Sequence, residues 1–273
     1  MINYVDPSRW IVLQFRPGSG GKILILCLMV IDRIAHWDPD VEKGNISHVQ
    51  SLKKYWNSND VGGWVSSEPV VHWHQDFYSR VYPRGDEIAA DEYNHLMNAN
   101  SLDYFKDCWA SGKIMVDCIH KSKIPSWHQG SKILKLGVDW NNLRYRNTLL
   151  SKLYHWDPIS RKGTSLLDHP NYQPSVNNLR KFNNQFEFGP FDNSDQWLEF
   201  VKTQYPSLQC QIESPDLMMD DLFYFDRVEH LIQSVAHSIN GKFDTDVLKA
   251  THDYWISKQE EFIKLNLPKI LDH

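Results

Sequence analysis

The sequence predicts a three-layer α/β protein with a central, mostly parallel sheet flanked by helices. Three short apolar runs, at residues 10–15, 113–120 and 132–138, have the length and composition of buried strands. Segments with helical patterns separate them, and an alternation of strands and helices is typical of a parallel sheet. With 273 residues, 41% of them hydrophobic, the chain can bury one large core, so we expect a single domain over residues 1–273.

A glycine-rich turn follows the first predicted strand and precedes an apolar helix expected at residues 23–36. Glycine adopts backbone conformations closed to other residues, so successive N–H groups of such a turn can point inward at the start of the helix. Lys22 adds a positive charge there. The sequence therefore predicts a phosphate-binding loop at residues 16–22, with glycines Gly18, Gly20 and Gly21. The alternative is an ordinary glycine-rich turn with a surface lysine.

The turn matches the Walker A pattern G-x-x-x-x-G-K-[ST] only in part. Arg16 stands where the pattern has its first glycine, and Ile23 stands where it has a hydroxyl residue. P-loop kinases and hydrolases hold Mg²⁺ with that hydroxyl, which an isoleucine lacks. His72 and His74 would share one face of a strand, but no third metal ligand accompanies them. We therefore expect a phosphate-bearing ligand that is bound without a metal.

The rest of the chain alternates between regular elements and long polar or aromatic segments. Residues 42–63 are polar, with a helical turn expected at 49–55, and residues 64–82 are aromatic. We expect long loop insertions near residues 42–82 and 157–195. Helices are expected at residues 86–112, 141–156, 197–205, 226–239 and 244–265, and a last strand is expected at 217–224.

Capping residues separate the two predicted C-terminal helices. Asn240-Gly241 predicts a left-handed turn at the end of the first helix, because glycine adopts that conformation readily. Asp244 can cap the start of the second helix. Val247 takes the N3 position there, so a capping box is absent.

Composition and charge exclude several classes of protein. The net charge is −5, so the chain lacks the basic surface of a general nucleic-acid-binding protein. Its four cysteines contain no C-x-x-C pair, which excludes a zinc knuckle and favours reduced thiols. The chain starts without a charged leader, and the apolar run at residues 23–31 is too short to span a bilayer. We expect a cytoplasmic protein with neither a nucleic acid nor a membrane as partner.

The order of these elements resembles the sulfotransferase-like family of P-loop-containing nucleoside triphosphate hydrolase-fold proteins. The resemblance rests on the first strand, the Pro-Gly-Ser-Gly-Gly-Lys loop and the helix after it. It continues with a strand ending in His120, a proline at Pro125, and the run at residues 132–138. The C-terminal run that begins at Asp221 is similar to the family's closing helices. The resemblance implies a three-layer P-loop fold.

The resemblance also implies transfer of a sulfuryl group from 3′-phosphoadenosine 5′-phosphosulfate to a hydroxyl or an amine. In such an enzyme Lys22 would neutralise charge on the bridging oxygen and His120 would take the acceptor's proton. Val138 stands where the family has an arginine for the 3′-phosphate. Arg144 and Arg146, on the next predicted helix, either supply that charge or form a solvated helix face. The loop residues expected to hold the nucleotide are Gly18, Ser19, Gly20, Gly21 and Lys22.

Two other functions stay open. An ATP- and Mg²⁺-dependent kinase or NTPase gains from the Gly21-Lys22 pair, with Asp117 or the pair Asp220-Asp221 as its acidic metal ligand. A non-catalytic member would keep the fold as a binding module, and the missing arginine favours it because catalysis needs a firmly held donor. For the transferase, the expected partners are a small-molecule nucleotide donor, such as 3′-phosphoadenosine 5′-phosphosulfate or its bisphosphate product, and an acceptor that the sequence does not identify.

Overall fold

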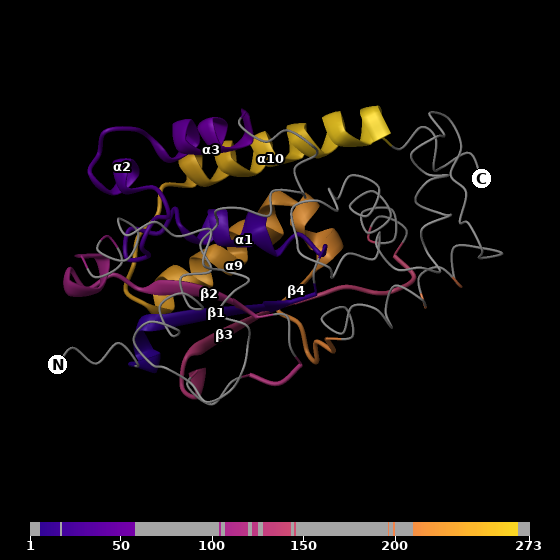
Figure 1. Cartoon of the computed structure of the whole chain (residues 1–273), viewed down its shortest axis with the longest axis horizontal. Coiled ribbons are helices and arrows are strands. Elements are labelled where there is room, and N and C mark those ends of the chain that lie inside the picture. Colours follow the sequence, from indigo (N-terminus) through magenta and orange to yellow (C-terminus); the bar gives the residue numbers. More distant parts are fainter. Residues whose placement is uncertain are drawn as a thin grey trace, which may run out of the picture.

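The computed structural model describes residues 6–16, 18–57, 104, 107–119, 122–124, 128–142, 145, 196, 199 and 210–266 of the chain. Its strands form one four-stranded sheet in the order β2-β1-β3-β4, and all adjacent strands are parallel (Figure 1). They are β1 (Trp10–Phe15), β2 (Met115–Ile119), β3 (Lys132–Gly137) and β4 (Leu217–Met218). The α/β class is confirmed, and so are the three strands expected from the apolar runs.

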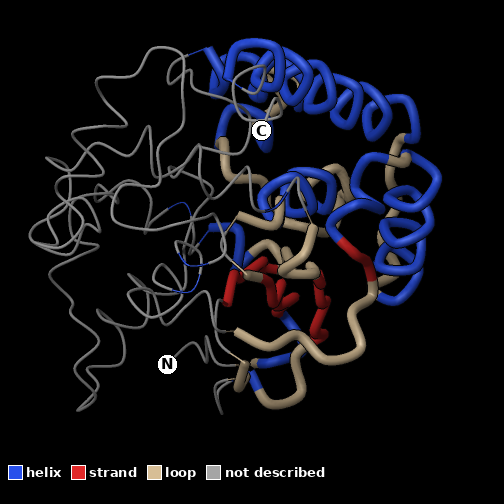
Figure 2. The backbone as a smooth tube through the Cα atoms, turned by 90° about the vertical axis from the view of Figure 1, so that its right-hand side faces the viewer, coloured by secondary structure: helices blue, strands red, loops and turns tan. Residues whose placement is uncertain are grey.

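Helices cover one face of this sheet. In Figures 1 and 2, α1 and α9 lie next to the strands, and α10 lies over these two helices with α3 beside it. Side chains of β1 on this face join the buried hydrophobic cluster to which these helices contribute. The helices in the described ranges are α1 (Gly21–Leu28), the short α2 (Pro39–Glu42), α3 (His48–Asn57), α9 (Phe225–Ser238) and α10 (Thr245–Asn266), and the 3-10 helix η1 (Pro7–Arg9) precedes β1.

The central strand β1 is buried on both faces. Ile11, Leu13 and Phe15 point toward the helices, since alternate residues of a strand share a face. Val12 and Gln14 point the other way and are also buried, at 0% and 2% exposure. A strand covered on both faces has a continuous apolar run rather than an alternating one. This is why the sequence predicts β1 with the correct bounds.

The first helix ends earlier than the sequence predicts. The apolar run at residues 23–36 predicted one helix, but α1 ends at Leu28 and turns follow it. Ile34 then forms a parallel bridge with Ile114, just before β2. Ile31 and Ile34 are 0% and 1% exposed, so their apolar character reflects burial at the sheet edge rather than a continuing helix.

The two C-terminal helices, α9 and α10, are confirmed, but the turn between them differs from the prediction. Asn240, not Gly241, has the left-handed backbone (φ 52°). The N–H of Gly241 donates to the carbonyl of Ala236 at 2.8 Å. A Cβ at Gly241 would lie 2.6 Å from Cγ2 of Ile31. Close packing against the turns that follow α1 therefore explains the glycine at this position.

Asp244 caps α10 as predicted. Its Oδ1 accepts the N–H groups of Asp246 and Val247 at 2.8 and 3.2 Å. The last strand is shorter than predicted, because β4 has two residues and the 3-10 helix η6 (Met219–Phe223) follows at once. Residues 219–223 of the run at 217–224 therefore belong to this turn of helix.

Two other helix predictions are confirmed in part. The helical turn expected at 49–55 belongs to the ten-residue α3. Residues 107–110 are helical and Gly112 follows with φ 85°, in agreement with the predicted end of the helix at 86–112. No helix in the described part of the chain is long and apolar enough to cross a bilayer. Outside the described residues lie His72 and His74, the segments 64–82 and 157–195, and most of the helices expected at 141–156 and 197–205.

Candidate functional site

The predicted phosphate loop connects the carboxyl end of β1 to the start of α1. Gly18 and Gly20 have φ values of 90° and 89°, which other residues adopt only with strain. Gly21 opens α1, and a Cβ there would lie 2.5 Å from the ring of Phe15. The N–H of Ile23 donates to the carbonyl of Gly20 at 3.0 Å. N–H groups at the start of a helix generally lack acceptors within it, and the helix dipole favours negative charge beside them. The turn therefore has a backbone suited to an anion.

Ser19 shapes this loop from within. Its side chain is completely buried, and its N–H and Oγ both donate to the carbonyl oxygen of Arg16, at 3.1 and 2.8 Å. The hydroxyl proton is therefore used to close the turn. Any anion at the loop would be bound by main-chain N–H groups rather than by this hydroxyl.

Lys22 lies on the first turn of α1, and its Nζ is buried. Burial raises the pKa of the Cys118 thiol, Asp117 raises it further, and Lys22 opposes both. The positive charge of Lys22 therefore lies near the C-terminal half of β2. The next residue, Ile23, is 2% exposed, so the position that holds Mg²⁺ in a Walker A loop belongs to the apolar core here.

Arg16 joins three segments at the carboxyl edge of the sheet. Its Nε donates to the carbonyl of Cys210 at 2.6 Å, and its Nη1 donates to the carbonyl of Val138 at 3.2 Å. The guanidinium carbon lies 4.8 Å from the ring centre of Trp140. Val138 stands in the place of an arginine in the sulfotransferase-like pattern. Here its main-chain carbonyl accepts a hydrogen bond from the guanidinium of Arg16.

This arginine stands beside a reversal of the chain connections. Among the described strands, β1 and β3 are neighbours in the sheet. The strand that follows β1 in the chain, β2, lies on one side of this pair, and the strand that follows β3, β4, lies on the other side. Open α/β sheets bind ligands outside the carboxyl ends of their strands, at such a reversal. The loop and Arg16 both occupy this edge, since they directly follow β1.

In the sequence, Arg16 stands out only as a departure from the Walker A pattern, and no motif marks Trp140. The carbonyl groups that Arg16 binds are 122 and 194 residues away in the chain. Local spacing cannot reveal such contacts. The one signal in the sequence is an arginine directly before a glycine-rich turn.

Three of the predicted site residues, His120, Arg144 and Arg146, lie outside the described residues. Residues close to them in the sequence, such as Ser122 and Tyr145, are described. Past β2, the carbonyl of Ser122 accepts a hydrogen bond from Nε2 of Gln14 at 3.0 Å, and its Oγ accepts the N–H of Gln211 at 2.7 Å. Tyr145 is fully buried and meets the ring of Trp140 edge-on at 5.4 Å. The segments around residues 122 and 210 are therefore tied to the end of β1.

Asp117, the candidate metal ligand of the kinase alternative, is committed to the fold. Its Oδ2 lies 2.7 Å from Nε2 of His128, and its Oδ1 accepts the N–H of Cys118 at 2.7 Å. The side chains of His128 and Asp117 are 0% and 1% exposed. Both carboxylate oxygens have partners, so the pair joins β2 to the turn that precedes β3.

Asp220 and Asp221 also have partners within the chain. Oδ2 of Asp220 accepts a hydrogen bond from Nδ2 of Asn142 at 2.6 Å, and Oδ2 of Asp221 accepts the N–H of Met218 at 2.8 Å. Within the described ranges, no three or more histidine, cysteine or acidic side chains form a group that could hold a metal ion. The predicted absence of a metal stays a prediction.

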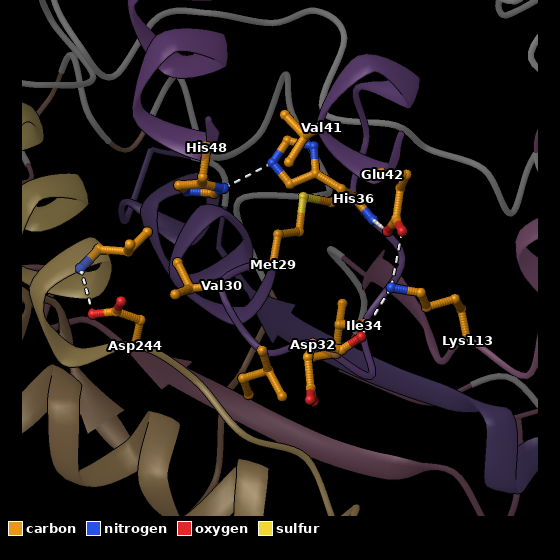
Figure 3. Close-up of a pocket in the computed structure, with 12 residues that line it drawn as sticks. Met29, Val30, Asp32, Ile34, His36, Val41, Glu42, His48, Lys113 and Asp244 are labelled. Atoms are coloured by element: carbon orange, nitrogen blue, oxygen red, sulfur yellow. Dashed lines mark hydrogen bonds and ion pairs between the residues drawn. The ribbon is translucent and has the colours of Figure 1, made fainter. Parts of the chain in front are cut away.

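A cavity of about 320 Å³ lies at the opposite, amino end of the sheet (Figure 3). On one side, Lys113 pairs with Glu42 at 2.9 Å and donates to the carbonyl of Asp32 at 2.9 Å. On another side, Nε2 of His36 lies 2.7 Å from Nδ1 of His48. None of the residues that line this cavity belongs to the loop at 16–22. The cavity and the predicted phosphate site are therefore separate.

No protein-family model matches this chain. Comparisons with curated proteins and with solved structures also give no match. The fold and the loop define an α/β protein with a glycine-rich turn at the carboxyl edge of a parallel sheet, and they identify no family.

Proposed function

We propose that the chain is a sulfotransferase-like transferase of the three-layer P-loop fold, which binds a nucleotide donor at residues 16–22 without a metal. The observation that carries this proposal is the turn between β1 and α1, where Gly18 and Gly20 have left-handed backbones. Its position at a reversal of the strand connections supports a ligand there. The buried ammonium of Lys22 adds positive charge beside the same helix start.

In the proposed reaction, the acceptor oxygen or nitrogen forms a bond to sulfur as the bond from sulfur to the bridging oxygen of 3′-phosphoadenosine 5′-phosphosulfate breaks. Main-chain N–H groups of the loop hold the 5′-phosphate, and Lys22 neutralises the charge that develops on the bridging oxygen. The leaving group is adenosine 3′,5′-bisphosphate. His120 takes the proton of the acceptor, an assignment that rests on the family resemblance alone.

The contacts of the acidic residues favour this reaction over an ATP- and Mg²⁺-dependent one. Asp117 is paired with His128, and Asp220 and Asp221 bind Asn142 and the main chain of Met218. Ile23 replaces the hydroxyl residue that would complete the metal site.

We propose the cytoplasm as the location, where reduced thiols are the rule.

A thermal-shift titration with adenosine 3′,5′-bisphosphate and with ATP, each with and without Mg²⁺, tests the proposal. At one hundred times Kd a ligand adds about 2.7 kcal/mol of stability, which raises the Tm of a chain of this length by about 5 °C. We expect this rise with the bisphosphate, independent of metal. A rise only with ATP and Mg²⁺ would support the kinase, and no response to either nucleotide would support a binding module.

Lys22→Ala should abolish the stabilisation by the bisphosphate, because the variant lacks the charge at the loop. Lys43→Ala is the matched control, since Lys43 is an exposed lysine next to α2. His120→Ala should keep the stabilisation and lose turnover. Equal stabilisation of Lys22→Ala and the wild type would contradict the assignment of the loop.

A further inference from the structure

Arg16 is held in place more firmly than a surface arginine and has donors to spare. Two main-chain carbonyls, of Cys210 and Val138, accept hydrogen bonds from its Nε and Nη1. The guanidinium stacks on Trp140, which fixes the plane of the group. A guanidinium has five N–H donors, so three remain, including both on Nη2. Within the described part of the chain, no carboxylate forms an ion pair with Arg16.

A second arginine, at the other end of β1, also stacks on a tryptophan and binds main-chain carbonyls, but its Nη2 is used within the protein. Arg9 lies 4.4 Å from the ring centre of Trp109 and donates from Nε and Nη2 to the carbonyl of Lys113. Its Nη2 also donates to the carbonyl of Trp109 at 2.9 Å. Burial lowers the pKa of Arg9, and the charge of Asp6 opposes that effect. Arg9 thus has a carboxylate nearby and uses its Nη2, whereas Arg16 has neither feature.

We propose that Arg16 is a specificity-determining residue, whose guanidinium binds a second anionic group of the ligand held by the glycine loop. The inference rests on the proposed function. The carbonyl groups and the ring orient Arg16 at the carboxyl edge, where the loop also lies, and its Nη2 carries two N–H donors for phosphate oxygens. The ligand class is then a small molecule with two separate anionic groups, such as a nucleoside 3′,5′-bisphosphate.

Calorimetric titrations of the full chain with adenosine 3′,5′-bisphosphate and with adenosine 5′-monophosphate test this assignment. A charge-assisted contact changes affinity by about 10- to 100-fold, so the wild type should prefer the bisphosphate by that factor. Arg16→Gln should bring the bisphosphate to the affinity of the monophosphate and leave monophosphate binding unchanged. Arg9→Gln is the matched control, since it removes a similarly stacked arginine far from the loop, and it should keep the preference.

Should Arg16→Gln fail to fold, the wild-type titration alone can still overturn the inference. Equal affinity for the two nucleotides would overturn the role of Arg16 while the proposed function stands. Binding of neither nucleotide would refute both. A loss of both affinities in Arg16→Gln to the same extent would mean that Arg16 only shapes the loop, and it would also overturn the inference.

Discussion

The buried pair of His36 and His48 makes the stability of this protein depend on pH. The N–H of Asp38 donates to Nδ1 of His36 at 3.0 Å, so that nitrogen carries no proton in the neutral ring. Nε2 of His36 therefore carries the proton and donates it to Nδ1 of His48 at 2.7 Å. Burial lowers the pKa of His36 to about 4 and that of His48 to about 3, from 6.5. Both rings are neutral in the folded protein at pH 7.

The sign of the effect follows from which state binds more protons. The unfolded chain binds protons at these two histidines below pH 6.5, whereas the folded protein does so only near pH 4 and pH 3. The pair's contribution is therefore fully present above pH 6.5 and is lost as the pH falls toward 4 and 3. When the pH falls from 7 to 5, each histidine lowers the free energy of unfolding by about 2 kcal/mol, so the pair lowers it by about 4 kcal/mol.

Urea unfolding at pH 5, 6, 7 and 8, followed by tryptophan fluorescence, measures this dependence. His48→Gln keeps an acceptor for the N–H of His36 but cannot titrate, so its stability should fall by about 2 kcal/mol less than that of the wild type between pH 7 and pH 5. His237→Gln is the control, since it removes an exposed histidine of α9 that lies outside the pair. Parallel pH curves for the wild type and His48→Gln would refute the reasoning.

Two further predictions concern single positions around the loop and the last helix. Gly21→Ala should lower the free energy of unfolding by about 1–3 kcal/mol, because its Cβ would lie 2.5 Å from the buried ring of Phe15; a variant as stable as the wild type in urea would contradict this. Asp244→Ala should cost about 1 kcal/mol, because α10 loses the acceptor for the N–H groups of Asp246 and Val247. Asp244→Asn keeps an acceptor and should cost less, so equal losses in the two variants would exclude capping as the cause.

Burial determined which elements the sequence could predict. Among the predicted strands, β3 is only partly buried, since Lys132 and Lys135 are half-buried. The strand β1 could be predicted with its bounds because a strand buried on both faces has a continuous apolar run. The same signal misled at α1, since Ile31 and Ile34 are buried in turns and at a bridge rather than in a helix. An apolar run records that a segment is buried and does not record its backbone conformation.

The candidate site was predicted only as far as it is local. The turn at residues 16–22 could be found because its glycines are adjacent in the chain. The contacts of Arg16 with Val138 and Cys210 could not, since they join segments brought together only by the folded sheet. The same is true of the Asp117 and His128 pair, which has no sequence signal.

The central place of β1 has a consequence for synthesis of the chain. Its partners in the sheet begin at Met115 and Lys132, so about a hundred residues must follow β1 before either edge can pair. At roughly 5–20 residues per second, the ribosome leaves the apolar segment at 10–15 unpaired for on the order of 5–20 s. The helices that cover the sheet, α9 and α10, emerge later still. A nascent chain of this protein therefore carries the apolar segment at 10–15 without its sheet partners during that interval.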